Sequence, residues 1–88
     1  MSKILVQPHE LDGLASSFDQ QGQAVDSVIR TLDSGLRIDW EGNTASAFRS
    51  DWESEFKPAL HALIEALQTG GQSLRNSAGR MRDADGQH

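Results

Sequence analysis

Aspartate recurs every seven residues in the first half of the chain, and these carboxylates are the first candidates for chemistry. The four residues are Asp12, Asp19, Asp26 and Asp33. Such a row could bind a basic partner or a hard cation. Residues one heptad apart on a helix are separated by about 10 Å along its axis, however, so the row cannot converge on one ion by itself. The simpler interpretation, which we prefer, is a solvated face beside a buried apolar seam.

No other set of residues forms a catalytic or metal-binding pattern. His9 and His61 lack a third ligand at a suitable spacing, and the serines have neither a strand-to-helix elbow nor a base partner. Cysteine is absent, which excludes a disulfide framework, a thiol nucleophile and a thiolate metal site. We therefore expect no enzyme, no cofactor and no metal site, and a binding function instead.

Length and composition predict a single small domain that depends on a partner. The chain has 88 residues, and Leu, Ile, Val and Phe make up about a fifth of them, near the lower limit for a domain that folds alone. The net charge of −5, with no basic cluster beyond Arg80 and Arg82, argues against nucleic acid. The apolar stretch before Pro8 is too short for a signal peptide, and no segment is long enough for stable membrane insertion.

Two helical segments must position these residues. Pro8 suits the first position of a helix, and a seven-residue apolar repeat then continues through residue 38. Apolar residues spaced three and four apart continue beyond the middle of the chain, and Pro58 among them predicts a bend near residues 54–58 rather than a break. The sequence thus predicts one all-α domain over 1–88, with a helix over about 8–38, a turn at 39–43, a second helix over about 44–83 and a flexible tail at 84–88.

The turn between these helices contains Trp40, Glu41 and Gly42. Glycine can adopt a positive φ without steric cost, as a tight reversal between antiparallel helices requires. Asn43 or Thr44 could then cap the second helix with a side-chain oxygen. A reversal here, near the midpoint of the chain, predicts an antiparallel helical hairpin.

A reversal near Glu41 brings together residues whose numbers sum to about 82. This register places Phe18 opposite Leu63 and Ile64 and leaves residues 75–88 overhanging, without a partner in the same chain. The apolar residues expected to form the seam of the hairpin and of its dimer are Leu11, Phe18, Val25, Ile29, Leu32, Phe48, Trp52, Phe56, Leu60, Leu63, Leu67 and Leu74.

The chain resembles the WXG-motif family, the small early-secreted-antigenic-target-like proteins that type VII secretion systems of actinobacteria and firmicutes export. The resemblance extends along the whole chain and depends on position, flanking pattern and length more than on the tripeptide alone. The matching residues are Ile4, Val6, Pro8, Leu11, Ala15, Trp40, Glu41, Gly42, Ala45, Phe48 and Trp52. It implies an antiparallel hairpin that pairs with a second hairpin into an elongated four-helix bundle.

The resemblance also implies how export is recognised. Family members carry a C-terminal signal of tyrosine, three residues and an acidic residue, which acts with the Trp-Xaa-Gly corner of the partner chain. On this chain the signal aligns with Met81 and Asp85, so methionine stands where the family has tyrosine. Either Met81 serves as an apolar anchor, or a sister protein carries the intact signal, and we favour the second. Trp40 is either a hydrophobic plug at the hairpin tip or part of a composite surface for the secretion ATPase.

We therefore expect a non-enzymatic protein that leaves the cytoplasm through a type VII system without a cleavable signal peptide. It would act as a dimeric substrate or as the export companion of a larger effector, in a virulence-associated or interbacterial role. The expected partners are an identical copy or a sister protein of the WXG-motif family, the secretion ATPase and a larger effector. The alternatives are a filament or needle-type secretion subunit and an intracellular coiled-coil adaptor.

Overall fold

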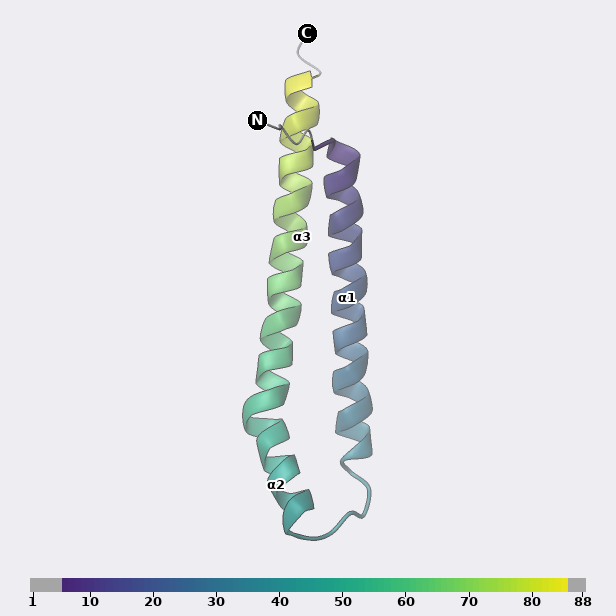
Figure 1. The fold of residues 1–88 in the computed structure, drawn as a ribbon, viewed down its shortest axis with the longest axis vertical. Helices are drawn as coiled ribbons and strands as arrows, with labels where there is room; N and C mark the ends of the chain where they lie inside the picture. Colours follow the sequence, from purple (N-terminus) through teal and green to yellow (C-terminus); the bar gives the residue numbers. More distant parts are fainter. Residues whose placement is uncertain (1–5, 86–88) are drawn as a thin grey trace, which may run out of the picture.

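A long antiparallel hairpin of helices makes up the structure. The computed structural model describes residues 6–85. The molecule extends over 68 × 28 × 16 Å, and the start of α1 lies beside the far part of α3 (Figure 1). The elements are α1 (Pro8–Gly35), α2 (Asn43–Asp51), the π-helix η1 (Trp52–Phe56) and α3 (Lys57–Asp85). The predicted all-α hairpin is confirmed.

α1 begins where its sequence favours a helix start. Gln7 precedes it in an extended conformation, with φ −90° and ψ 148°. Pro8 occupies the first helical position, where its missing amide hydrogen leaves no bond unmade, and Glu10 lies in the first turn, beside the positive end of the helix dipole.

The prediction that the first helix continues to residue 38 is wrong, because α1 ends at Gly35. The amides of Arg37 and Ile38 bond to carbonyls three residues back, at 3.2 and 3.3 Å, as in a tightened final turn. The Arg49 side chain donates to the carbonyl oxygens of Leu36 and Ile38, which lie beyond the end of α1 and have no α-helical partner. A residue of the second helix therefore satisfies carbonyls that the end of α1 leaves free.

The second helix begins one residue earlier than predicted, with Asn43 as its first residue and Gly42 as its N-cap. The Gly42 carbonyl accepts a hydrogen bond from the Ser46 amide at 3.1 Å. No side chain caps this helix, so the predicted capping role of Asn43 or Thr44 is wrong. Glycine supplies the backbone geometry at this end instead of a side-chain acceptor.

A π-helical turn, η1, stands where a bend was predicted near Pro58. The Lys57 amide donates to the carbonyl of Trp52, five residues back. Proline has no amide hydrogen, and its ring would crowd the carbonyl of Ser54 in a regular α-helix. The wider π-helical turn accommodates the proline ring, and the residues on both sides of it remain helical. The ribbon is therefore unbroken from α2 into α3 (Figure 1).

The predicted register, which placed Phe18 opposite Leu63 and Ile64, is wrong. The Phe18 ring lies against Gly70, so that a Cβ atom added there would be 2.8 Å from the ring. The contacts between the helices show the shift: Asp33 meets Trp52 and Phe18 meets Gly70, so the paired residue numbers sum to 85 and 88, above the predicted sum of about 82. Each part of α1 therefore meets a later part of the second helix than predicted.

The predicted overhang of residues 75–88 is wrong over the described part for the same reason. Arg75 forms an ion pair with Asp19, and Arg82 forms one with Asp12, so α3 contacts α1 beyond residue 80. α3 also continues through Asp85, which makes residues 84–85 of the predicted flexible tail helical. Residues 86–88 of that tail lie outside the described residues.

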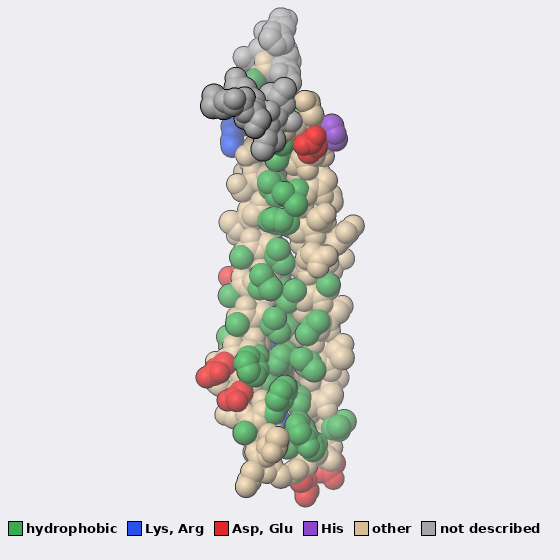
Figure 2. Space-filling view, in the orientation of Figure 1, with side chains coloured by type: hydrophobic (Ala, Val, Ile, Leu, Met, Phe, Trp, Pro, Cys, Tyr) green, Lys and Arg blue, Asp and Glu red, His purple; other side chains and the backbone are tan. Residues whose placement is uncertain are grey.

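The hairpin covers few of its apolar side chains completely. The buried apolar residues are Ala15, Ile29, Ala45, Trp52 and Ala78. The large apolar side chains that remain exposed are Val6, Leu14, Val28, Ile38, Trp40, Phe48, Phe56 and Leu63. Figure 2 shows hydrophobic side chains gathered in a band along one face of the molecule, over both α1 and α3. A second chain could cover this surface, which a single hairpin leaves in water.

Candidate functional site

Trp40 lies in the loop between α1 and α2, at one end of the hairpin. Its side chain remains 38% exposed. The ring centroid is 6.3 Å from that of Phe48 in a tilted arrangement, and Phe48 lies 6.3 Å from Phe56 in turn. These three residues form an exposed aromatic row from the loop along the first turns of the second helix. Tilted pairs at this separation are favourable beyond the area that they bury.

Gly42 sets the direction in which the chain enters α2. It has φ 117° and ψ 169°, a conformation that side chains with a Cβ rarely adopt. No other residue in the described part of the chain has a positive φ. Glu41, between Trp40 and this glycine, is exposed. The motif thus consists of an exposed ring and a backbone reversal that glycine alone permits without strain.

Arg49 contacts the loop that carries Trp40 from the side of α2. Its Nε donates to the Leu36 carbonyl and one terminal nitrogen donates to the Ile38 carbonyl, each at 3.0 Å. Its guanidinium carbon lies 5.7 Å from the centre of the Trp40 ring, within cation–π range.

Trp52 is the second tryptophan, and its environment differs from that of Trp40. Its side chain is only 2% exposed, and its indole N–H donates to the Asp33 carboxylate at 2.8 Å. Lys57 binds the other oxygen of Asp33 at 3.0 Å and lies 3.8 Å from Glu53. Asp33 therefore links the last turns of α1 to η1 and to the start of α3.

The same contacts shift two pKa values in opposite directions. The hydrogen bond from Trp52, followed by that from Lys57, lowers the pKa of Asp33 below its ordinary value of 3.8. The hydrogen bond to Asp33 raises the pKa of Lys57 above 10.5. Each group is charged more readily in the folded chain because its partner stabilises the charged form.

We expect this pair to make the stability of the hairpin depend on pH at both extremes. The contribution of Asp33 is fully present above the unfolded pKa of 3.8 and is lost as the pH falls through the lower folded value. The contribution of Lys57 is present below 10.5 and is lost as the pH rises through its raised value. Urea unfolding of the parent and of Asp33→Asn between about pH 2 and pH 7 would measure the acid limb. The parent should lose stability more steeply, and equal slopes would contradict this assignment.

The aspartate row has a structural role that the sequence did not reveal. Three of its members reach across the seam to cations of α3, and Asp26 pairs within α1 at 2.8 Å. The pairs are Asp12–Arg82, Asp19–Arg75, Asp26–Arg30 and Asp33–Lys57. The row is therefore not only a solvated face, since it borders the helix–helix contact. The seven-residue separation of Arg75 and Arg82, equal to that of the aspartates, was the signal that could have indicated this.

The predicted seam residues divide into three groups by exposure. Ile29 and Trp52 are buried, whereas Phe48, Phe56 and Leu63 are exposed. The half-buried members are Leu11, Phe18, Val25, Leu32, Leu60, Leu67 and Leu74. The exposed group does not belong to the seam within the hairpin.

Two small residues outside the predicted list of seam residues lie at the helix contact. Ala15 and Ala78 are fully buried, and a Cβ atom added to Gly71 would lie 3.7 Å from the carbonyl oxygen of Ala15. The helices approach closely there because the residues are small. The adjacent glycines of the second helix were the available signal for this approach.

Met81 and Asp85, the residues aligned with the export signal, both lie in α3. Met81 is half-buried. The two residues are about one helical turn apart, as their spacing of four requires.

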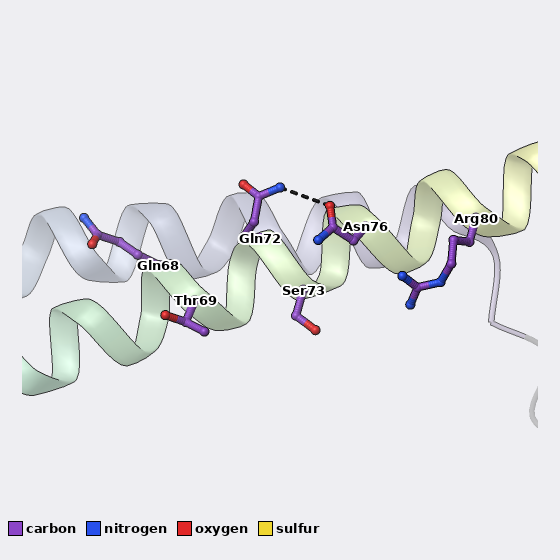
Figure 3. A pocket seen from close by; sticks show the side chains of 6 residues that line it. All are labelled: Gln68, Thr69, Gln72, Ser73, Asn76 and Arg80. Carbon is purple, nitrogen blue, oxygen red and sulfur yellow. Dashed lines mark hydrogen bonds between the residues drawn. The ribbon is translucent and has the colours of Figure 1, made fainter.

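A row of mainly uncharged polar side chains follows α3 (Figure 3). The residues are Gln68, Thr69, Gln72, Ser73, Asn76 and Arg80. Gln72 Nε2 donates to Asn76 Oδ1 at 3.1 Å. They line a shallow depression formed by a single helix, which lacks the enclosure of a small-molecule site. We regard this row as a solvated face.

Residues 6–85 contain no group of three or more metal-ligating side chains placed to hold an ion. None of the helices in this range has the length and apolar content that a bilayer span requires.

The fold and the loop together define a class of protein, a short antiparallel helical hairpin whose helices are joined through Trp40, Glu41 and Gly42. Residues 3–86 match the family model WXG100, described as "Proteins of 100 residues with WXG". The chain belongs to this family, which confirms the resemblance. Members of the family are small secreted substrates of type VII secretion systems, and pairing into a four-helix bundle is known among them.

Solved structures agree with this assignment. EsxA from Geobacillus thermodenitrificans, crystal form I, is 30% identical with a TM-score of 0.88, and the match covers 99% of this chain and 96% of that chain. The secreted protein EsxB from Bacillus anthracis str. Sterne, in selenomethionine-labelled form, is 26% identical with a TM-score of 0.80, over 97% of this chain and 99% of that chain. A single-residue variant of the same EsxB is 25% identical with a TM-score of 0.81, over 100% and 99%. No curated protein sequence matches this chain.

Proposed function

We propose that this hairpin functions as one half of a dimer that a type VII system exports, either as a substrate in its own right or as the companion of a larger effector. The exposed apolar side chains support the pairing, since they include Leu14 and Val28 of α1 and Leu63 of α3. Burial of such side chains against a second hairpin removes apolar area from water, at roughly 25 cal/mol per Å². The partner is an identical copy or a sister protein of the same family.

The export machinery, in this proposal, recognises the loop end of the hairpin. The observation that carries it is the position of Trp40, which remains exposed in the loop while Phe48 and Arg49 contact its ring. A ring that served only to fill the core would be covered, as Trp52 is. Trp40, together with the tail of the partner chain, would present a composite surface to the secretion ATPase.

Export of Trp40→Ala tests this function. We expect the ratio of secreted to cell-associated protein to fall about tenfold or more, the effect of losing roughly 1.4 kcal/mol of recognition energy. Ile38→Ala is the matched control, because Ile38 lies in the same loop and is 64% exposed. Quantitative immunoblots of medium and cells, with a lysis marker, provide the measurement. Export of Trp40→Ala at the parent level would overturn the proposal.

The same assay assigns the C-terminal signal. Loss of export in Asp85→Ala would place the signal on this chain, with Met81 as its apolar anchor. Retained export would place it on a sister protein. Native mass spectrometry of the chain co-expressed with the product of the neighbouring gene then distinguishes a homodimer from a heterodimer, and masses increasing without limit would indicate a filament instead.

A further inference from the structure

The loop that carries Trp40 has few hydrogen bonds of its own. Within the loop, the Trp40 amide donates to the Ile38 carbonyl at 2.9 Å. The other backbone bonds of residues 36–42 tie its ends to the helices: the amides of Leu36, Arg37 and Ile38 donate to carbonyls of α1, and the Gly42 carbonyl accepts from Ser46 of α2. Two further bonds come from one side chain, that of Arg49, which lies 13 residues beyond Leu36 in the chain. Within residues 6–85, no other side chain bonds to the backbone of this loop.

We propose that Arg49 is the residue that positions Trp40 for recognition by the export machinery. Its guanidinium binds the carbonyls of Leu36 and Ile38, on the side of the loop that precedes the tryptophan. The same group lies over the Trp40 ring, which also pairs with Phe48. Arg49 thus fixes both the backbone that leads to Trp40 and the orientation of its ring.

The chemistry of arginine suits this role better than that of lysine. The guanidinium is planar, permanently charged and carries five N–H donors in a fixed arrangement, so Nε and a terminal nitrogen can bond to two carbonyls while the plane stacks on an aromatic face. Lysine offers a single ammonium group at the end of a flexible chain. Arg49 is also half-buried, which strengthens its bonds to the carbonyl oxygens compared with those of a fully solvated side chain.

This inference rests on the proposed function, because it gives Trp40 a partner in recognition. It adds that export depends on a residue outside the Trp-Xaa-Gly motif. Arg49 is a positioning residue in this account, and the ring of Trp40 is what the machinery contacts.

Fluorine NMR of the full chain labelled with 5-fluorotryptophan tests the position of Trp40 directly. The two tryptophans yield two resonances, which Trp40→Phe assigns. In Arg49→Gln and in Arg49→Lys, we expect the Trp40 resonance to move towards the position of free 5-fluorotryptophan, while that of Trp52 remains within the range seen in the control. Arg30→Gln is the matched control, because the Arg30 side chain is 79% exposed and its one ion-pair partner within residues 6–85 is Asp26.

Circular dichroism shows which variants keep their helices. If Arg49→Gln loses them, the lysine variant, which retains the charge, serves for the same comparison. A Trp40 resonance that remains at the parent position in the folded variant, or that moves no further than the Trp52 resonance, would overturn the role of Arg49.

Measuring export of these variants distinguishes a failure of the role of Arg49 from a failure of the proposed function on which it rests. We expect both Arg49 variants to be exported several-fold less than Arg30→Gln, with no rescue by lysine. Normal export of Trp40→Ala would refute the proposed function, whatever Arg49 does. Impaired export of Trp40→Ala beside normal export of folded Arg49→Gln and Arg49→Lys would refute only the role of Arg49.

Discussion

Replacing Trp52 by alanine is expected to lower the free energy of unfolding by about 3–5 kcal/mol. Trp52 is only 2% exposed and is the largest side chain in the buried set. The substitution would leave a cavity between η1 and α1, and it would remove the indole N–H that Asp33 accepts. Few other large side chains are covered in this hairpin, so the remaining core cannot compensate.

Urea unfolding followed by circular dichroism measures this loss, at one fixed protein concentration because pairing contributes to apparent stability. Trp52→Phe retains most of the ring and removes the N–H, so its loss should be clearly smaller. Trp40→Ala removes the same side chain from a site that is 38% exposed, and it should also cost less. A Trp52→Ala variant that unfolds at the same urea concentration as the parent would show that the tip of the hairpin does not depend on this residue.

Replacing Leu63 by glutamate is expected to separate the hairpin from its partner. Leu63 is 45% exposed on α3, so its replacement should leave the fold of the single hairpin intact. A charge introduced into the proposed apolar interface should raise the dissociation constant about 30-fold or more. Sedimentation velocity over a range of concentrations, on the complex that native mass spectrometry identifies, is the measurement.

Gln72→Glu is the matched control for this substitution. Gln72 lies nine residues later on α3, which places it about half a turn around the helix from Leu63, within the polar row of Figure 3. Both substitutions add one negative charge and retain a good helix former. Only Leu63→Glu should dissociate the complex while leaving the helical signal intact. If Gln72→Glu dissociates it instead, the polar face is the interface and the apolar one is not.

Local chemistry in the sequence determined the elements of this protein. Apolar residues spaced three and four apart predict two amphipathic helices because that spacing puts them on one helical face. Pro8 indicates where the first helix begins, and Gly42 indicates a reversal, since glycine alone adopts its φ of 117° without strain. Trp40 next to that reversal also follows from the sequence. Each of these features depends on neighbouring residues only.

The tertiary structure alone decided how the helices align. Phe18 meets Gly70 where Leu63 and Ile64 were predicted, a difference of seven or six residues. When the apolar residues of a seam repeat every seven positions, sliding one helix by one heptad still places apolar residues opposite one another. The apolar pattern therefore could not distinguish the two registers. The choice depends on contacts between distant residues: the Trp52 indole on Asp33, the ion pairs of Arg75 and Arg82, and the two carbonyls that Arg49 binds beyond the end of α1. These contacts form only when the two helices pack together, so the sequence pattern of either helix alone could not predict them.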